Sequence, residues 1–244
     1  MPKSLMSVNS HLDYASLSEE FSREGRVQVK EFLDPEAAGN LSDILQHHTP
    51  WGLAWRAQDG EPCSTRREAL LAMTPKQHAE RDSSILETMR LAGGYAFQFA
   101  SYPMLDAYLQ RWTPDSVHDL ILEHLNDTPF LNAIRAISGI ATLRKADAQA
   151  TLYAPGHFLA EHNDSHVAEG WRLAYVLNLC PVEWRPDWGG YLNFLNDDGD
   201  IVCGWKPRFN CLNLFSVPQK HNVSFVPPFA PIGRFAITGW VRDV

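Results

Sequence analysis

The sequence predicts an α+β fold with a mainly β core, in which helices support a jelly-roll barrel. Helical periodicity with capping signals runs through residues 1–140. From about residue 141 to residue 244, short apolar or alternating runs are bounded by Gly, Pro, Asn and Asp. Because no linker separates the two parts, we expect one domain over residues 1–244, with 1–140 as a mostly helical support region and 141–244 as the core that carries the site.

Capping residues mark the expected helices of the first part. Helix starts are indicated where an N-cap residue precedes a proline, at residues 34–35, 74–75, 113–114 and 128–129. Gly25 and Gly139 stand where helices are expected to end. Residues 27–32 and 95–102 have the alternation of strands. His118 and His124 belong to the helix expected after residue 113, and we place both at the surface or its boundary.

The second part consists of short strands. Seven runs are apolar or alternate in polarity, at residues 149–153, 172–179, 191–195, 201–205, 211–215, 222–226 and 234–240. Residues 196–200, with the sequence Asn-Asp-Asp-Gly-Asp, suit a hairpin turn. Strands at this spacing are typical of an all-β sandwich or barrel such as a jelly roll.

Composition restricts the classes of partner. A net charge of −8 without a long Lys/Arg run argues against nucleic acid as the main partner. No run approaches the roughly 18 apolar residues of a membrane span, and residues 1–10 do not resemble a signal peptide. The four cysteines form no Cys-x-x-Cys pair. We therefore expect a cytoplasmic protein with reduced thiols, no nucleic-acid partner and no membrane contact.

A His-x-Asp pair provides the first candidate site. On a strand, residues i and i+2 share a face, so His162 and Asp164 would project into one cavity. His157 and His166 flank the pair, but we favour His-x-Asp over a helical spacing. His221, after another apolar run, is the best third ligand. Two imidazoles and one carboxylate leave three positions of an octahedron open, as non-haem iron(II) oxygenases require.

A buried cation could complete the site. Arg234 follows His221 by 13 residues, on an expected strand that returns through the barrel. Its guanidinium could bind a carboxylate with two hydrogen bonds. Tyr153 precedes His162 by nine residues, and its phenol could donate to the same carboxylate.

The ordered motifs resemble a known enzyme family. They are Tyr153-x-x-Gly-x-x-x-x-x-His-x-Asp, Leu177-Asn, Gly189-Gly-Tyr-Leu, Asn213-Leu-Phe, His221-x-Val and Arg234-x-Ala-Ile-Thr-x-Trp. Together they cover roughly residues 130–242. This set is similar to the prolyl 4-hydroxylase-like branch of the 2-oxoglutarate- and iron(II)-dependent dioxygenases, whose fold is the double-stranded β-helix form of the jelly roll. It resembles in particular the branch members that bind 2-oxoglutarate through Arg instead of Lys.

The resemblance implies a role for each motif. His162, Asp164 and His221 become iron ligands, Arg234 pairs with the distal carboxylate of 2-oxoglutarate, and Tyr153 assists. Some relatives have a tyrosine where this chain has Val176, directly before Leu-Asn. Tyr175 would serve only if the strand register shifted by one residue, because neighbouring residues face opposite sides; otherwise that contact is missing. The metal ligands aside, no further catalytic residue is expected.

Four more residues are expected to line the cavity or its rim: Arg172, Asn178, Leu192 and Trp240. The implied reaction is hydroxylation of an aliphatic C–H, on a prolyl residue of a protein substrate. It uses iron(II), 2-oxoglutarate and dioxygen, with ascorbate as a further candidate cofactor. Two alternatives stay open: the same chemistry on a free amino acid or other small molecule, and a non-catalytic metal-binding module or sensor. The oligomeric state has no signal in the sequence.

Overall fold

A computed structural model describes residues 5–57, 60–164 and 170–244. Thirteen strands in this part of the chain form one sheet with antiparallel pairing, in the order β1-β11-β8-β13-β6-β4-β7-β12-β9-β10, and β2, β3 and β5 join it at the side. The strands are β1 (Arg26–Lys30), β2 (Gly52–Arg56), β3 (Cys63–Thr65), β4 (Phe97–Tyr102), β5 (Lys145–Ala146), β6 (Gln149–Tyr153), β7 (Phe158–His162), β8 (Trp171–Asn178), β9 (Leu192–Leu195), β10 (Ile201–Trp205), β11 (Cys211–Ser216), β12 (His221–Val223) and β13 (Arg234–Arg242).

The sheet curls on itself into a barrel. Its larger layer runs from β1 through β11, β8, β13 and β6 to β4, and its smaller layer contains β7, β12, β9 and β10. β4 pairs with both β6 and β7 and so links the layers. Phe194 of β9 packs on Phe215 of β11 with ring centroids 5.1 Å apart, which closes the interior on the opposite side. Side chains that face inward from both layers therefore share one enclosed space.

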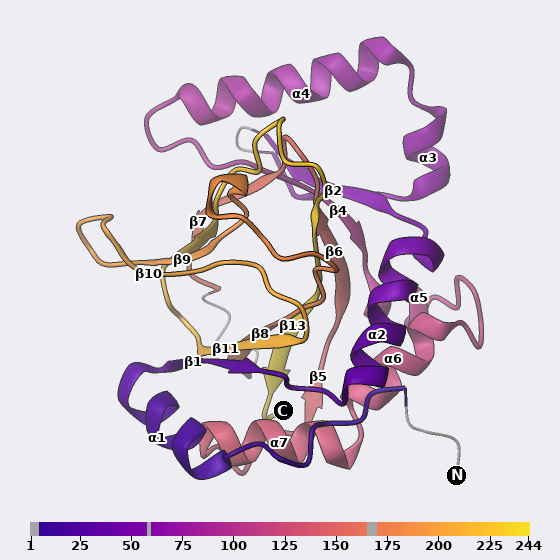
Figure 1. The fold of residues 1–244 in the computed structure, drawn as a ribbon. Helices are drawn as coiled ribbons and strands as arrows, with labels where there is room; N and C mark the ends of the chain where they lie inside the picture. The colour runs from indigo at the N-terminus through magenta and orange to yellow at the C-terminus, as the bar shows by residue number, and fades with distance from the viewer. Residues whose placement is uncertain (1–4, 58–59, 165–169) are drawn as a thin grey trace.

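Helices cover the outside of the larger layer (Figure 1). They are α1 (Tyr14–Glu24), α2 (Pro35–Asp43), α3 (Arg67–Ala72), α4 (Pro75–Arg90), α5 (Met104–Leu109), α6 (Val117–Leu125) and α7 (Thr128–Ser138), with a π-helical turn at Ile44–His48 and a 3₁₀ turn at Pro186–Trp188. α1 and α7 pack together below β1, β11 and β8, whereas α4 crosses the top near β2 and β4. No helix in the described ranges is long and apolar enough to span a membrane.

Local sequence explains where these helices begin and end. The Asp34 carboxylate caps α2 at the Glu36 N–H, and Thr74 forms a capping box with Gln77 at the start of α4. Gly25 and Gly139 adopt left-handed conformations after α1 and α7. The predicted start at Thr113-Pro114 is wrong: α6 begins at Val117, because the Ser116 hydroxyl accepts from the Asp119 N–H and caps the helix there.

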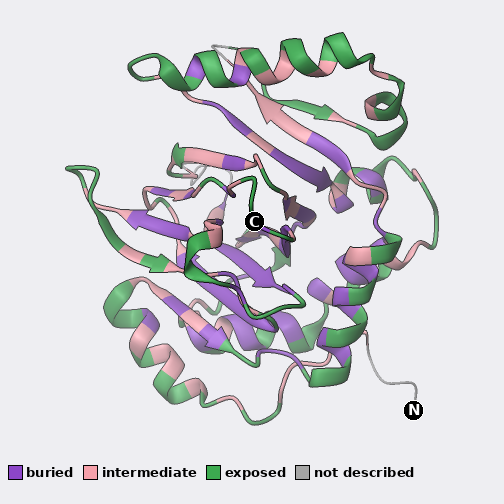
Figure 2. Ribbon diagram, turned by 45° about the horizontal axis from the view of Figure 1, so that its top comes forward, coloured by how far each residue is buried: buried purple, intermediate pink, exposed green. Residues whose placement is uncertain are grey.

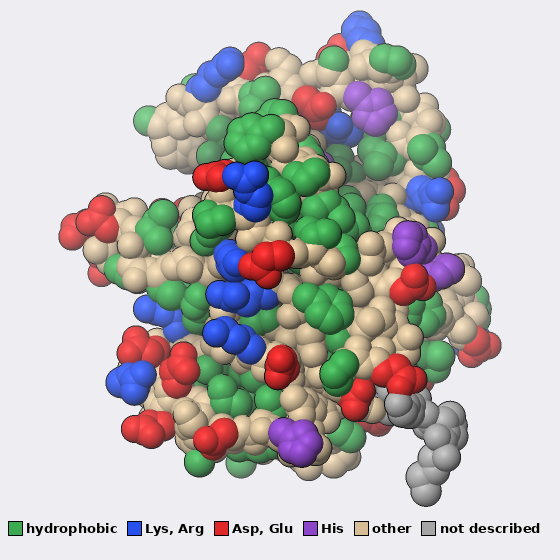
Figure 3. Space-filling model, viewed as in Figure 1, with side chains coloured by type: hydrophobic (Ala, Val, Ile, Leu, Met, Phe, Trp, Pro, Cys, Tyr) green, Lys and Arg blue, Asp and Glu red, His purple; other side chains and the backbone are tan. Residues whose placement is uncertain are grey.

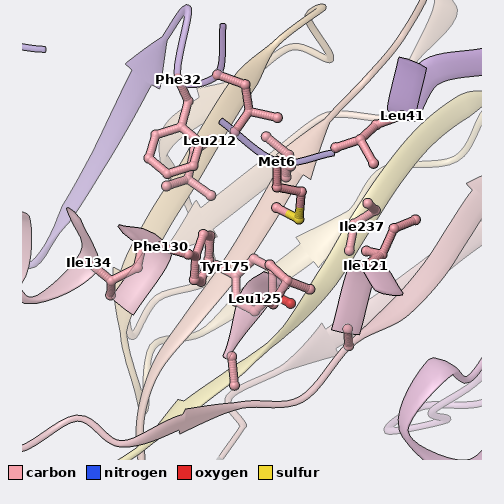
Figure 4. Packing of buried hydrophobic residues seen from close by; sticks show 14 of the residues in the cluster. Met6, Phe32, Leu41, Ile121, Leu125, Phe130, Ile134, Tyr175, Leu212 and Ile237 are labelled. Carbon is pink, nitrogen blue, oxygen red and sulfur yellow. The ribbon is translucent and has the colours of Figure 1, made fainter. Parts of the chain in front are cut away.

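The main hydrophobic core lies between the helices and the outer face of β8, β11 and β13 (Figure 4). Phe130 of α7 contacts both Phe32 and Tyr175 edge to face. Met6 is 3% exposed within this core, so the chain is packed into the fold at this residue, ahead of α1. Burial is concentrated on the strands and on the helix faces that meet them, and the outer helix faces are exposed (Figure 2).

The seven predicted strands are all present, with ends that differ by a few residues at most. The structure adds β5 and β7, and it places four strands from residues 1–140 in the same sheet. The four cysteines are free thiols. The placement of His118 at the surface or its boundary is wrong: the residue is 4% exposed, with Nε2 3.0 Å from the Thr49 hydroxyl.

Candidate functional site

Two neighbouring strands bring the predicted histidines together. His162 ends β7 and His221 begins β12, and the two residues are direct partners in the antiparallel ladder. Their ring centroids are 4.1 Å apart. Asp164 lies beyond the end of β7 with a φ of 52°, a left-handed conformation that Asp tolerates better than most residues. The sequence suggested that His162 and Asp164 share a face through strand alternation, but Asp164 lies outside the strand. The turn after β7 directs its carboxylate back toward both rings.

The three side chains converge on one point. Asp164 Oδ1 is 3.6 Å from His162 Nε2, and Asp164 Oδ2 is 3.5 Å from His221 Nε2. One ligand atom from each residue lies within 4.8 Å of the others, which suits a shared metal ion. Among the described residues, this is the one group of three or more His, Cys, Asp or Glu side chains with such spacing. The donor set, two imidazoles and one carboxylate, is that of a facial triad.

Hydrogen bonds orient both imidazoles for coordination. His162 Nδ1 lies 3.0 Å from the Ala160 carbonyl oxygen, and His221 Nδ1 lies 2.7 Å from that of Gln219. A carbonyl accepts only, so Nδ1–H is the donor and the Nε2 lone pair points toward Asp164. Burial, followed by the nearby His162, lowers the pKa of His221 to about 4. Its ring is therefore neutral near pH 7, which is the form that binds a metal.

The triad opens onto a cavity of about 890 Å³ inside the barrel, which we call the central cavity. Its walls include inward-facing residues of both layers, and all three triad residues line it. Tyr153, Leu192, Arg234 and Trp240 line the same cavity. The structure thus brings these predicted site residues into one space.

Arg234 is a buried cation in this cavity. It is 2% exposed, and it is the register partner of Tyr153 across β13 and β6. Nε donates to Asn178 Oδ1 at 3.2 Å, and Nη1 donates to the Gly190 carbonyl oxygen at 3.1 Å. Burial lowers the pKa of the guanidinium, yet an arginine in a protein keeps its proton. Arg234 makes no ion pair with any carboxylate of the described residues, so its charge has no counterion there.

The Gly189-Gly190 pair explains how the Gly190 carbonyl reaches Arg234. Both residues have positive φ, 58° and 65°. A Cβ on Gly189 would lie 2.0 Å from the Phe225 carbonyl oxygen, so no side chain fits at this position. The close approach of these two segments holds the Gly190 carbonyl beside the guanidinium.

Tyr153 forms the floor of the cavity next to Arg234. Its ring stacks on Phe99 with centroids 5.0 Å apart, and the Arg234 Cζ lies 5.5 Å from its ring centroid. Burial raises the pKa of the phenol, which therefore stays protonated and able to donate a hydrogen bond. Tyr153 is thus held in position by stacking and presents a neutral donor beside a cation.

Tyr175 and Val176 face opposite sides of β8. The Tyr175 ring packs on Phe130 in the helix-covered core, and its hydroxyl donates to the Asp147 carbonyl oxygen at 2.8 Å. Val176 packs with Leu192 on the barrel side. β8 runs without a register shift against β11, so nothing rotates the Tyr175 side chain toward Arg234. The Tyr175 ring and hydroxyl are therefore engaged on the helix side of β8 and not beside Arg234.

The other predicted cavity residues have different surroundings. Leu192 and Trp240 line the central cavity, and Trp240 stacks on Trp171 with ring centroids 4.1 Å apart. Asn178 is 1% exposed and contributes by accepting from Arg234. Arg172 is not among the cavity-lining residues; its Nε donates to Asp243 Oδ2 at 2.6 Å.

His157 lies outside the triad. Its Nδ1 accepts from the Ala154 N–H at 3.1 Å, which fixes the turn between β6 and β7. His166 falls outside the described residues.

Part of the cavity wall was not predicted from the sequence. Tyr95, Phe97 and Phe99 line it from β4 and the residues before it, and the β2–β3 hairpin contributes Ala54 and Ser64. The alternation of residues 95–102 predicted a strand. Because this strand was assigned to the support region, nothing in the sequence indicated that it lies beside Tyr153.

Comparisons with known proteins agree with this arrangement. Residues 148–242 match the family model of the 2OG-Fe(II) oxygenase superfamily. The match spans the strands from β6 to β13 and contains the three triad residues and Arg234. No curated protein sequence matches the chain.

Solved structures with low sequence identity share the fold. A Pseudomonas putida prolyl-4-hydroxylase has a TM-score of 0.57 at 18% identity, covering 97% of this chain and 94% of its own. A Burkholderia pseudomallei oxidoreductase of the 2OG-Fe(II) oxygenase family has a TM-score of 0.62 at 13% identity, covering 96% and 93%. A Trichoplax adhaerens prolyl hydroxylase, in complex with a peptide fragment of the hypoxia inducible factor oxygen degradation domain, has a TM-score of 0.59 at 14% identity, covering 94% and 89%. The barrel is thus a double-stranded β-helix with added helices.

Proposed function

Because residues 148–242 match the family model of the 2OG-Fe(II) oxygenase superfamily, we propose that the central cavity is the catalytic centre of a dioxygenase that hydroxylates a prolyl residue in a protein substrate. The single observation that carries the proposal is the position of Arg234. A buried guanidinium that has no carboxylate partner among the described residues shares one cavity with a two-histidine, one-carboxylate cluster. A buried charge is costly unless it is paired, so an anionic ligand is expected at this place.

The triad fits iron(II). His162 and His221 would supply Nε2, since their Nδ1 atoms are engaged by backbone carbonyls. Asp164 would supply a carboxylate oxygen. When bound, the iron would activate dioxygen with electrons from the 2-oxo acid and so provide the oxidising power for C–H hydroxylation. The protein holds the ligands on one side and leaves the other side facing the cavity.

Arg234 would bind the distal carboxylate of 2-oxoglutarate. Nε and Nη1 are held by Asn178 and the Gly190 carbonyl, so the guanidinium plane is fixed before the co-substrate arrives. Tyr153 would donate its phenolic proton to the same carboxylate. This arrangement separates the two ends of the co-substrate, with the carboxylate at Arg234 and the 2-oxo acid group directed to the metal ligands.

The size and character of the cavity support a larger second substrate. A volume of about 890 Å³ lies in the upper part of the range that holds drug-sized ligands, and 2-oxoglutarate is smaller than those. Trp171, Trp240 and Tyr95 offer aromatic walls that suit an apolar pyrrolidine ring. Two of the structurally similar proteins are prolyl hydroxylases, which favours a prolyl target over a free small molecule. Strands from both parts of the chain share the sheet, which supports one domain over residues 1–244.

The test is succinate formation from 2-oxoglutarate by the purified protein, with and without iron(II) and with and without ascorbate. We expect iron-dependent turnover that is lost in His162→Ala. His47→Ala is the matched control, because that histidine is exposed and does not line the central cavity, and it should retain turnover. A non-catalytic module would give no succinate in any of these samples. A mass gain of one oxygen atom on proteins, and not on free amino acids, would separate the two substrate classes.

A further inference from the structure

A second hollow adjoins the central cavity. Its volume is about 280 Å³, and it shares Ser64, Ser101 and Pro103 with the wall of the central cavity. It lies between the β2–β3 hairpin, the start of α3 and the loop before α6, and we call it the hairpin groove. Because the two hollows share lining residues, the hairpin groove lies directly beside the central cavity.

A pre-positioned cation lines the hairpin groove. The Arg66 guanidinium lies over the Trp112 ring, with Cζ 3.4 Å from the ring centroid, and Nη2 donates to Gln110 Oε1 at 3.1 Å. The Trp112 indole N–H donates to the same oxygen at 2.9 Å. Stacking and this shared acceptor hold the guanidinium plane in one orientation. Nη2 uses one of its two protons for Gln110, and Nε and Nη1 form no hydrogen bond within the described ranges, so one edge of the fork keeps two free N–H groups.

The backbone around Arg66 is also fixed. A Cβ on Gly52 would lie 2.2 Å from the Thr65 carbonyl oxygen and 3.2 Å from the Arg66 Cα. Glycine in β2 thus allows the end of β3 to lie directly against it. The contact with Gly52 holds the backbone of Arg66, and stacking on Trp112 holds its side chain.

The charge of the hairpin groove is positive overall. Arg66 and Arg67 line it, and Glu68 is its one acidic residue among those described. Arg66 makes no ion pair with Glu68 or with any other carboxylate in residues 5–57, 60–164 and 170–244. An exposed, oriented guanidinium without a counterion matches the planar geometry of a carboxylate.

We propose that the hairpin groove binds an acidic side chain, Asp or Glu, of a peptide substrate whose target residue occupies the central cavity. This inference rests on the proposed function. It predicts a substrate that is extended across the β2–β3 hairpin and carries its acidic residue at a fixed distance along the chain from the hydroxylated residue. Arg66 would act as a specificity residue and not in the chemistry.

The test uses acetylated, amidated peptides with a central proline and with Asp, Asn or Lys at each flanking position in turn. Oxygen incorporation is followed by mass spectrometry for the wild type, Arg66→Ala, Arg66→Glu and Arg90→Ala. Arg90 is an exposed arginine of α4 that lines neither hollow, and it serves as the control. We expect kcat/KM of the wild type and of Arg90→Ala to be about tenfold higher for Asp than for Asn at one position. Arg66→Ala should lose this preference, and Arg66→Glu should prefer Lys at the same position.

The outcomes separate this inference from the proposed function. Equal rates for the Asp and Asn peptides at every position in the wild type would overturn the acidic subsite, while peptide hydroxylation would stand. An unchanged acid preference in Arg66→Ala would also overturn it. Succinate formation without oxidation of any peptide would overturn the peptide substrate and this inference together, and would leave the dioxygenase chemistry intact.

Discussion

Replacement of Arg234 tests the reasoning about the co-substrate most sharply. Arg234 is 2% exposed and its guanidinium has no carboxylate partner within the described residues, so a bound carboxylate would complete a buried ion pair. Removing one partner of such a pair costs about 3–5 kcal/mol. At about 1.4 kcal/mol per factor of ten, Arg234→Ala should weaken 2-oxoglutarate binding on the order of 100- to 1,000-fold or more. Arg234→Lys keeps the charge but loses the planar fork, and about a tenfold loss is expected.

The assay is anaerobic calorimetry of 2-oxoglutarate binding to the iron(II)-loaded protein. Arg172→Ala is the control, because Arg172 lies on neighbouring β8 outside the cavity lining and should leave the affinity unchanged. Thermal unfolding of each variant establishes that it is folded. An affinity of Arg234→Ala within about twofold of the wild type would refute the assignment of Arg234 as the carboxylate-binding residue, since so small a change corresponds to less than about 0.5 kcal/mol.

Three further predictions follow from individual contacts. Burial lowers the pKa of His118 to about 4 from its ordinary value near 6.5, so between pH 7 and pH 4 the unfolded state binds a proton that the folded state does not bind. The free energy of unfolding should therefore drop by about 3 kcal/mol as the pH falls over this range. In His118→Gln, urea denaturation should show a smaller drop over the same range. Gly189→Ala forces a Cβ against the Phe225 carbonyl oxygen at positive φ, and it should lower the free energy of unfolding in urea by about 1–3 kcal/mol. It should also weaken 2-oxoglutarate binding, because the Gly190 carbonyl is displaced. A variant as stable as the wild type would contradict this. Tyr153→Phe keeps the stacking on Phe99 and should retain the melting temperature while 2-oxoglutarate binds up to about tenfold more weakly by calorimetry.

Much of the barrel was predictable because its strands are punctuated by residues with strong local preferences. Glycine, proline, asparagine and aspartate bound each run after residue 141, and the seven runs became seven strands. The start of α6 was predicted three residues too early, at Thr113-Pro114, because the Ser116 hydroxyl caps this helix instead. His118 was misplaced because a single histidine carries no sign of its partner, and Thr49, which contacts its ring, is 69 residues away.

The site was predictable in its residue types and less so in its geometry. The spacing of His162, Asp164 and His221 identified the cluster, but the left-handed turn at Asp164 depends on the end of β7 and not on the two-residue spacing. The alternation of β8 could be inferred, and it turned Tyr175 away from the barrel. The hairpin groove left no local pattern, because Arg66 and Trp112 meet only through the tertiary fold.

The central claim is that the triad and Arg234 bind iron(II) and 2-oxoglutarate as one site. The most direct measurement is calorimetric binding of 2-oxoglutarate under anaerobic conditions, with and without iron(II), to the wild type and to Asp164→Ala. Iron(II) should strengthen 2-oxoglutarate binding to the wild type by at least about tenfold and have no effect on Asp164→Ala, because only the intact triad holds the metal beside the co-substrate. Equal affinity with and without iron(II) in the wild type would contradict the account.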